Sequence, residues 1–169
     1  MNGHSLGHDD INHAEIAEKA DAILDKFGIT EPVVDAVRIA NGLGFKVKEI
    51  TMPPRYFDVA GFYNNKDKTI YVQASDKPWR KLFTVAHEIG HNVLGHKNYE
   101  VLFRVQNKDQ RYSEVEREAN SFAASLLMPN WMLNRYLDAY GLTKKDYREM
   151  AKIFGVSEKA MEPILLYLK

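Results

Sequence analysis

Residues 82–94 carry two histidines and a glutamate within an apolar helical pattern, in the order His87-Glu88-x-x-His91. Residues four apart on an α-helix lie about 40° from each other, so both histidines project from one face and can share a metal ion. Neutral imidazoles suit Zn²⁺, and a site with three protein ligands leaves a fourth position for a water whose pKa the metal lowers to about 7. Glu88 lies beside them and can take the proton of that water. The pattern predicts the central helix of a metallopeptidase.

The same five-residue pattern also arises by chance on amphipathic surface helices, where it leaves two solvated histidines. Here both histidines fall at the border of a broad apolar arc, where a cleft would lie. The arc consists of Leu82, Phe83, Val85, Ala86, Ile89, Gly90, Val93 and Leu94. This setting favours the metal site over the solvated helix.

His96 is the first candidate for the third ligand, and it fits poorly. The extended pattern HExxHxxGxxH needs glycine and histidine where the chain has Leu94 and Lys97. If the helix continues, His96 points about 160° away from the shared direction of the two motif histidines. We therefore expect a histidine at the helix end near Gly95, favourable at the negative end of the helix dipole.

A better candidate lies in residues 114–128, which predict a second amphipathic helix. Its apolar arc consists of Val115, Ala119, Phe122, Ala123, Leu126 and Leu127. Of the nearby charged residues only Glu116 falls inside the arc, whereas Glu114, Arg117 and Glu118 point elsewhere. A carboxylate directed at a core is costly unless it is paired or binds a metal, so Glu116 is the expected third ligand.

Two further interpretations concern this helix. Ser113-x-x-Glu116 also has the form of a capping box, in which Glu116 would return to the backbone N–H of Ser113. Asn120, one turn beyond Glu116, could hydrogen-bond a ligand histidine and fix its tautomer, or it could be a plain exposed asparagine.

The chain resembles the ImmA/IrrE-type metallopeptidases, and two blocks carry the resemblance. Residues 80–91 are similar to the RxxFTxAHExGH block of that family, and EREANSFAASLLMP at 116–129 is similar to its ExxANxFAxxLLMP block. Residues 60–63 and 70–72 resemble the two strands that precede the metal helix. The resemblance spans roughly residues 17–169.

The resemblance implies a gluzincin-like zinc peptidase, with His87, His91 and Glu116 as ligands and Glu88 as the base. It further implies an intracellular enzyme that cleaves helix-turn-helix transcriptional repressors. Larger members carry an added DNA-binding or sensor domain, so this chain looks like the stand-alone peptidase form.

Composition agrees with a single domain. A chain of 169 residues, 45% of them apolar, can bury one core, expected over residues 13–169 after a flexible tail at 1–12. Lys and Arg equal Asp and Glu at 23 each, so no global field attracts nucleic acid or an anionic membrane. The absence of cysteine fits a reducing compartment and excludes thiolate zinc. With no signal peptide and no apolar run of membrane-spanning length, the expected location is the cytoplasm.

The expected fold is α+β and zincin-like, with a small, mostly antiparallel sheet packed on helices. Hydrophobic periodicity and turn residues predict helices from 13 to 27 and from 30 or 31 to 42, a strand at 45–50, and a hairpin of 59–63 with 69–73. Asp76 and Pro78 are expected to start the metal helix. Helices at 131–140, 144–154 and 157–168 follow.

The last two helices read like a helix-turn-helix, but the second carries Glu158, Glu162 and Pro163, which repel phosphates and bend the helix. We expect structural packing there and no direct contact with nucleic acid.

The predicted function is zinc-dependent peptide hydrolysis, with Mn²⁺ as the other possible metal. Zn²⁺ would polarise the scissile carbonyl while Glu88 moves the proton from water to the leaving amine. A peptide would pair with an exposed strand edge near Gly61 and Phe62. Two alternatives remain open, namely a protein-binding antirepressor with structural zinc and a DNA-binding regulator that uses the C-terminal helices.

Overall fold

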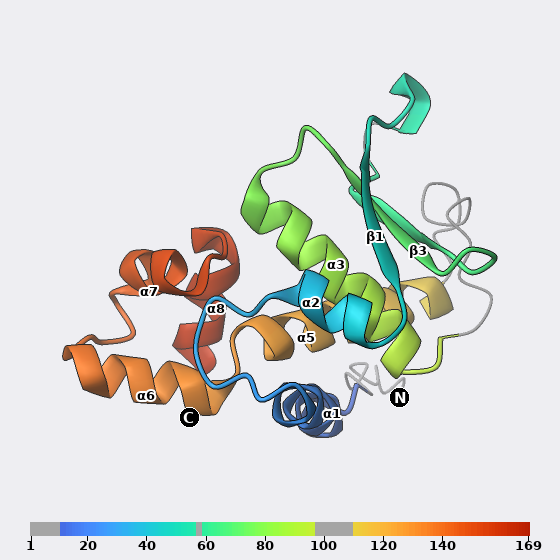
Figure 1. Cartoon of the computed structure of the whole chain (residues 1–169). Coiled ribbons are helices and arrows are strands. Elements are labelled where there is room, and N and C mark those ends of the chain that lie inside the picture. Colours follow the sequence, from blue (N-terminus) through green and yellow to red (C-terminus); the bar gives the residue numbers. More distant parts are fainter. Residues whose placement is uncertain (1–10, 57–58, 97–109) are drawn as a thin grey trace, which may run out of the picture.

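The computed structural model describes residues 11–56, 59–96 and 110–169. A small sheet lies over a group of helices, with the C-terminal helices to one side (Figure 1). The order is α1 (His13–Lys26), α2 (Ala36–Gly42), β1 (Lys46–Ile50), the 3₁₀ turn η1 (Pro54–Tyr56), β2 (Gly61–Asn64), β3 (Thr69–Gln73), α3 (Pro78–Val93), α5 (Gln110–Leu127), α6 (Asn130–Tyr140), α7 (Tyr147–Phe154) and α8 (Glu158–Tyr167). The predicted α+β class is confirmed.

The sheet is mixed, whereas the sequence predicted mostly antiparallel pairing. Its order is β1-β3-β2. Strands β2 and β3 form the predicted antiparallel hairpin, in which Gly61 lies opposite Val72. Strand β1 is parallel to β3, with Lys46 opposite Thr69. A tight hairpin turn imposes an antiparallel pair, but the connection from β1 to β2 is long enough for the chain to reverse, so the strand pattern did not determine the direction of β1.

The start predicted for the second helix is wrong. Helix α2 begins at Ala36, and the side chain of Asp35 accepts a hydrogen bond from the backbone N–H of Arg38 at 2.9 Å. Asp35 is a better N-cap than the residues before Pro32, because its carboxylate satisfies a backbone donor of the first turn. Residues 1–10 of the predicted tail lie outside the described ranges, and Asn12 is the N-cap of α1.

Helix α3 runs through the middle of the protein between the sheet and α5. Val85, Ala86 and Ile89 of α3 are at most 1% exposed. Helix α5 approaches α3 closely at Gly90, where a Cβ would meet Cδ1 of Phe122 at 3.0 Å. This approach brings the polar residues of the two helices within reach of each other.

The C-terminal helices contribute to the same core. Met150 and Phe154 of α7 and Met161 and Leu165 of α8 are fully buried. In the parts of the chain that the structure describes, no helix combines the length and the apolar character needed to cross a membrane.

Candidate metal centre

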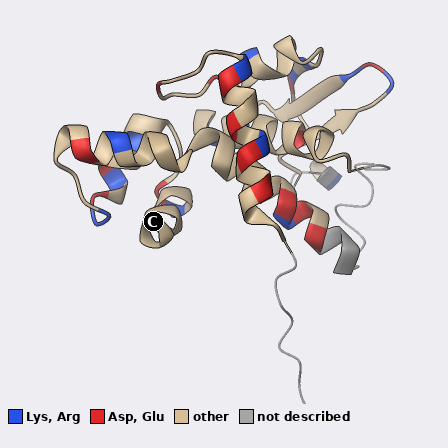
Figure 2. Ribbon diagram, turned by 90° about the horizontal axis from the view of Figure 1, so that it is seen from below, with Lys and Arg blue, Asp and Glu red and all other residues tan. Residues whose placement is uncertain are grey.

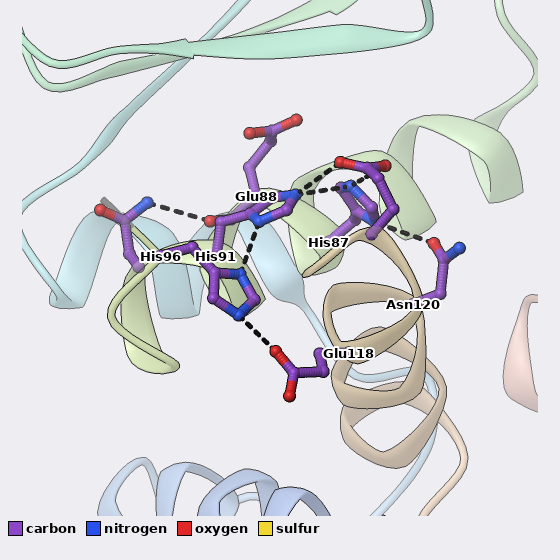
Figure 3. A network of polar contacts seen from close by, with 8 residues as sticks. His87, Glu88, His91, His96, Glu118 and Asn120 are labelled. Atoms are coloured by element: carbon purple, nitrogen blue, oxygen red, sulfur yellow. Dashed lines mark hydrogen bonds and ion pairs between the residues drawn. The ribbon is translucent and has the colours of Figure 1, made fainter. Parts of the chain in front are cut away.

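Two histidines of α3 and one glutamate of α5 converge on a single point. Figure 3 shows His87 and His91 side by side on α3. The Nε2 atoms of His87 and His91 lie 3.0 Å apart. Oε2 of Glu116 lies 3.2 Å from Nε2 of His87, and Oε1 lies 3.1 Å from Nε2 of His91. The predicted placement of the metal site on two helices is confirmed.

These distances suit a shared cation. In a tetrahedral zinc site the N and O ligands, about 2.0–2.1 Å from the ion, stand about 3.3 Å from one another. The observed separations come within a few tenths of an ångström of that value. His87, His91 and Glu116 form the group, within the described part of the chain, whose potential ligand atoms all lie within 4.8 Å of one another.

Glu116 is not the end of a capping box. Helix α5 begins at Gln110, so Ser113 lies inside the helix and not at its N-cap. Burial acts to raise the pKa of Glu116, but hydrogen bonds with His87 and His91 outweigh burial and lower the pKa to about 2. The carboxylate is therefore ionised at neutral pH and can serve as a ligand.

Burial has the dominant effect on His91. It lowers the pKa of the imidazole, against the opposing influence of Glu116. A neutral imidazole offers a lone pair to a metal, so this shift also favours metal binding.

Asn120 contacts the far side of His87. Its Oδ1 lies 2.8 Å from Nδ1 of His87. An amide oxygen only accepts hydrogen bonds, so Nδ1 of His87 donates to it, and Nε2 is the nitrogen that faces Glu116 and His91 and that a metal would take. This is the contact with a ligand histidine that the sequence pattern indicated as one of two possibilities for Asn120.

His91 is held on its far side by residues that sequence reasoning missed. Its Nδ1 lies 2.8 Å from Nδ1 of His96, and Nε2 of His96 lies 2.8 Å from a carboxylate oxygen of Glu118 (Figure 3). The expectation that His96 points away assumed a continuing helix. Instead α3 ends at Val93, and Gly95 with φ of 73° reverses the chain.

The turn at Gly95 carries a signal that could have revealed this contact. A glycine directly after a helix commonly takes the left-handed conformation and folds the next residue back over the last turn. Here the backbone N–H of His96 donates to the carbonyl of His91 at 3.0 Å. The helical projection used for His96 therefore does not apply beyond Leu94.

Glu88 is fully buried beside the three candidate ligands. Figure 3 shows its carboxylate on the side of the histidines that faces the sheet, away from His96 and Glu118. Its charge acts to raise the pKa of His91. The carboxylate is thus positioned near the convergence point without being part of it.

Gly61 and Phe62 lie on β2, the outer strand next to β3. Gly61 packs tightly, since a Cβ there would meet Cγ2 of Thr84 on α3 at 2.5 Å. The ring of Phe62 stacks on Tyr71 with centroids 4.9 Å apart. The strand edge that the sequence predicted for peptide binding therefore lies against the metal helix, one turn before Glu88.

An apolar pocket of about 590 Å³ adjoins the candidate metal centre between α3, α5 and α8. Asn120, the residue in contact with His87, forms part of its wall. Phe83, Ala124, Met128, Ala160 and Ile164 also line it. The pocket thus reaches from Asn120, on the Nδ1 side of His87, to the C-terminal helices.

Comparison with known proteins places these residues in context. Residues 43–163 match the family described as the IrrE N-terminal-like domain. The chain is 31% identical over 99 residues to the radiation response metalloprotease IrrE of Deinococcus radiodurans, covering 57% of this chain and 30% of the relative. It is 29% identical over 83 residues to the uncharacterized immunity region protein 2 of Bacillus phage phi105, covering 48% of this chain and 52% of the phage protein. The match therefore spans about half the length of the phage protein and less of the metalloprotease.

A solved structure of a transcriptional regulator from Mycobacterium tuberculosis has a similar fold. The TM-score is 0.64 at 15% sequence identity, and the match covers 87% of this chain and 54% of the regulator. At this identity the likeness concerns the fold alone.

Proposed function

The chain belongs to the family of the IrrE N-terminal-like domain, and from that premise we propose that it is a zinc-dependent endopeptidase. The convergence of His87, His91 and Glu116 within 4.8 Å is the observation that carries this proposal. Two imidazoles and one carboxylate form a ligand set that suits zinc and leaves a coordination position open. Mn²⁺ is the second candidate, because carboxylate ligands also suit it.

His87, His91 and Glu116 would hold the metal, and Glu88 would move the proton. When bound, a metal of this kind supplies a Lewis acid for the scissile carbonyl and a water of lowered pKa. Glu88 accepts the proton of the attacking water and passes it to the leaving amine. Its burial beside the histidines keeps the carboxylate close to the reacting atoms and away from bulk solvent.

A polypeptide substrate fits the surroundings of the centre. The edge strand β2, with Gly61 and Phe62, would pair with an extended segment of the substrate. The pocket beside Asn120 would receive an apolar side chain next to the scissile bond. Together they would orient the peptide across the metal centre.

The substrate class that we infer is a helix-turn-helix transcriptional repressor in the cytoplasm. The resemblance to ImmA/IrrE-type metallopeptidases supports this inference, as does similarity to proteins named for a radiation response and an immunity region. The absence of cysteine is consistent with a reducing compartment.

Direct binding to DNA has less support. Figure 2 shows acidic residues interspersed with basic ones along the ribbon. On α7, Lys152 pairs with Glu149 at 2.9 Å, and Arg148 pairs with Glu158 of α8 at 3.5 Å. These pairs offset positive charge that phosphate contacts would need.

The decisive experiment compares wild type and Glu88→Gln with a purified repressor substrate. We expect Glu88→Gln to remain folded and to retain zinc, while cleavage falls by about 10²–10⁴-fold, the usual contribution of a general base. Cleavage by the variant at the wild-type rate would refute the role of Glu88. Tight binding of the repressor without cleavage by the wild type would favour the antirepressor with structural zinc.

Metal content measured on the same preparations tests the ligand set. About one zinc per chain is expected in the wild type, as in other sites with three protein ligands. Glu116→Ala should lose zinc, and Glu114→Ala should keep it. Glu114 is a suitable control because it is exposed on the same helix.

A further inference from the structure

A chain of hydrogen bonds runs from His91 through His96 to Glu118 (Figure 3). The two imidazole Nδ1 atoms lie 2.8 Å apart, and Nε2 of His96 lies 2.8 Å from Oε2 of Glu118. The side chains of His91 and His96 are 3% and 8% exposed, whereas Glu118 is 35% exposed. The chain thus starts at a buried candidate ligand and ends at a carboxylate near the surface.

The position of each proton in this chain follows from Glu118. An ionised carboxylate only accepts hydrogen bonds, so Nε2 of His96 donates to it. In the tautomer of His96 with its proton on Nε2, Nδ1 carries a lone pair, and the Nδ1–H of His91 donates to it. The remaining nitrogen of His91, Nε2, lies 3.1 Å from Oε1 of Glu116 and is the one that a metal would take.

We propose that His96 and Glu118 are positioning residues that hold His91 in its metal-binding tautomer and orientation. The proposal rests on the metal site of the proposed function but does not depend on peptidase activity. Hydrogen-bonding partners of metal-ligating histidines fix the ring and raise its basicity, and removing such a partner weakens metal affinity by about 10- to 100-fold.

The two candidate histidine ligands are supported in different ways by one helix. Asn120 of α5 holds His87 through a neutral amide, whereas Glu118 of α5 acts on His91 through a second imidazole. Because residues 116 and 120 are one helical turn apart, they share a face, and Glu118 projects from another part of the helix. Glu118 can therefore reach only a residue displaced from the metal centre, and the turn at Gly95 places His96 there.

The test measures the dissociation constant for Zn²⁺ by competition with a chelator. The variants are Glu118→Ala, Glu118→Gln, His96→Leu and His96→Asn, with Glu114→Ala as the control. We expect Glu118→Ala and His96→Leu to weaken zinc binding by about 10- to 100-fold. Glu118→Gln should lose less, because its amide oxygen still accepts from His96. His96→Asn should partly restore the affinity lost in His96→Leu, because its amide oxygen can accept from Nδ1 of His91.

The visible absorption spectrum of the Co²⁺-substituted proteins gives a second readout, since it reports ligand geometry. We expect the spectrum to change in Glu118→Ala and His96→Leu and to stay unchanged in Glu114→Ala. Wild-type zinc affinity and spectrum in all His96 and Glu118 variants would overturn the proposal. So would losses in Glu118→Ala that match those in a variant destabilised far from the centre, such as Gly141→Ala.

Failure of the proposed function would give a different pattern. A wild type that binds zinc tightly but cleaves no repressor would refute the peptidase, while weaker zinc binding in Glu118→Ala would still support the positioning role. Conversely, active cleavage together with unchanged zinc affinity in every variant would refute the positioning role alone.

Discussion

At the scale of single residues, Glu116 and His91 make the protein sensitive to acid when the metal is removed. The pKa of Glu116 in the folded protein is about 2, against an ordinary value of 4.5. Burial lowers the pKa of His91 below its ordinary value of 6.5. Both groups therefore take up a proton more readily in the unfolded chain, so acid favours unfolding.

We expect the free energy of unfolding of metal-free protein to fall in two stages. The contribution of His91 decreases below pH 6.5, and that of Glu116 decreases from pH 4.5 toward about 2. Urea unfolding in the presence of a chelator, at a series of pH values, measures this dependence. His91→Gln should lack the first stage and Glu116→Gln the second, whereas parallel curves for all three proteins would contradict the assignment.

The residues of the candidate site were predictable to different degrees. Helical periodicity was sufficient to place His87, His91 and Glu116 together, because each lies within a regular helix whose apolar arc fixes its direction. The same reasoning failed for His96, which lies beyond the helix end. Its contact depends on the left-handed conformation of Gly95, and helical spacing carries no information past such a turn.

At the scale of elements, the turn that ends α3 has its own consequence for the metal centre. Gly95 has φ of 73°, and a Cβ there would meet no atom of the described residues within 4 Å. The expected cost of Gly95→Ala is conformational strain, about 1–2 kcal/mol for an L-residue in the left-handed region. Because strain in this turn displaces His96, we expect zinc affinity to fall as well as stability.

Gly141 provides a matched control for this prediction. It ends α6 with φ of 62°, and a Cβ there would likewise meet no described atom within 4 Å. Figure 1 shows α6 far from the C-terminal end of α3. Thermal unfolding and chelator competition on both variants should show similar losses of stability and a loss of zinc affinity in Gly95→Ala alone. Equal zinc affinities in Gly95→Ala and Gly141→Ala would show that the turn at Gly95 does not affect metal binding.

The edge strand β2 allows a prediction about substrate binding. Phe62 stacks on Tyr71, and this aromatic pair would contact a peptide added at the edge. Phe62→Ala should raise KM by about fivefold, the effect of losing roughly 1 kcal/mol of aromatic contact, with zinc content unchanged. Steady-state cleavage of a repressor-derived peptide measures KM. Val47→Ala on β1, at the opposite edge of the sheet, is the control. Equal KM values in the two variants would contradict peptide binding at β2.

The elements themselves were largely predictable, but their pairing was less so. The turn at Asn64-Asn65-Lys66-Asp67 indicated the hairpin of β2 and β3 because turn residues act locally. The parallel position of β1 depends on how a longer connection packs, which residue propensities do not encode. The start predicted for α2 was wrong because Pro32 and Asp35 are both plausible start signals, and the N-cap hydrogen bond from Arg38 to Asp35 decides between them.

At the scale of the whole molecule, the C-terminal helices complete the surroundings of the metal centre. Ala160 of α8 lines the same pocket as Asn120 of α5. We expect Ala160→Trp to fill the pocket and to lower kcat/KM by about tenfold, because a pocket next to the scissile bond discriminates by size. Kinetics with the repressor substrate and zinc analysis of the variant measure this effect.

A second pocket supplies the control. It has a volume of about 580 Å³ and is lined by Ala17, Trp131 and Tyr167 among others, and Asn120 is not part of its wall. Ala17→Trp should leave kcat/KM unchanged. If both tryptophan variants slow cleavage equally, the pocket beside Asn120 has no special role. The assignment of residues 13–169 to one domain remains a prediction at this scale.

The position of the metal centre across two helices has a consequence for the chain as a polymer. His91 precedes residues 94–109 in the chain and Glu116 follows them. An ion bound by both residues would therefore cross-link α3 and α5. In a chain without cysteine this link would do the work of a disulfide, worth on the order of 3 kcal/mol for a loop of such length. Because ligands of the native state stabilise it by mass action, the supply of metal would set how long the protein survives in the cell as well as whether it can act.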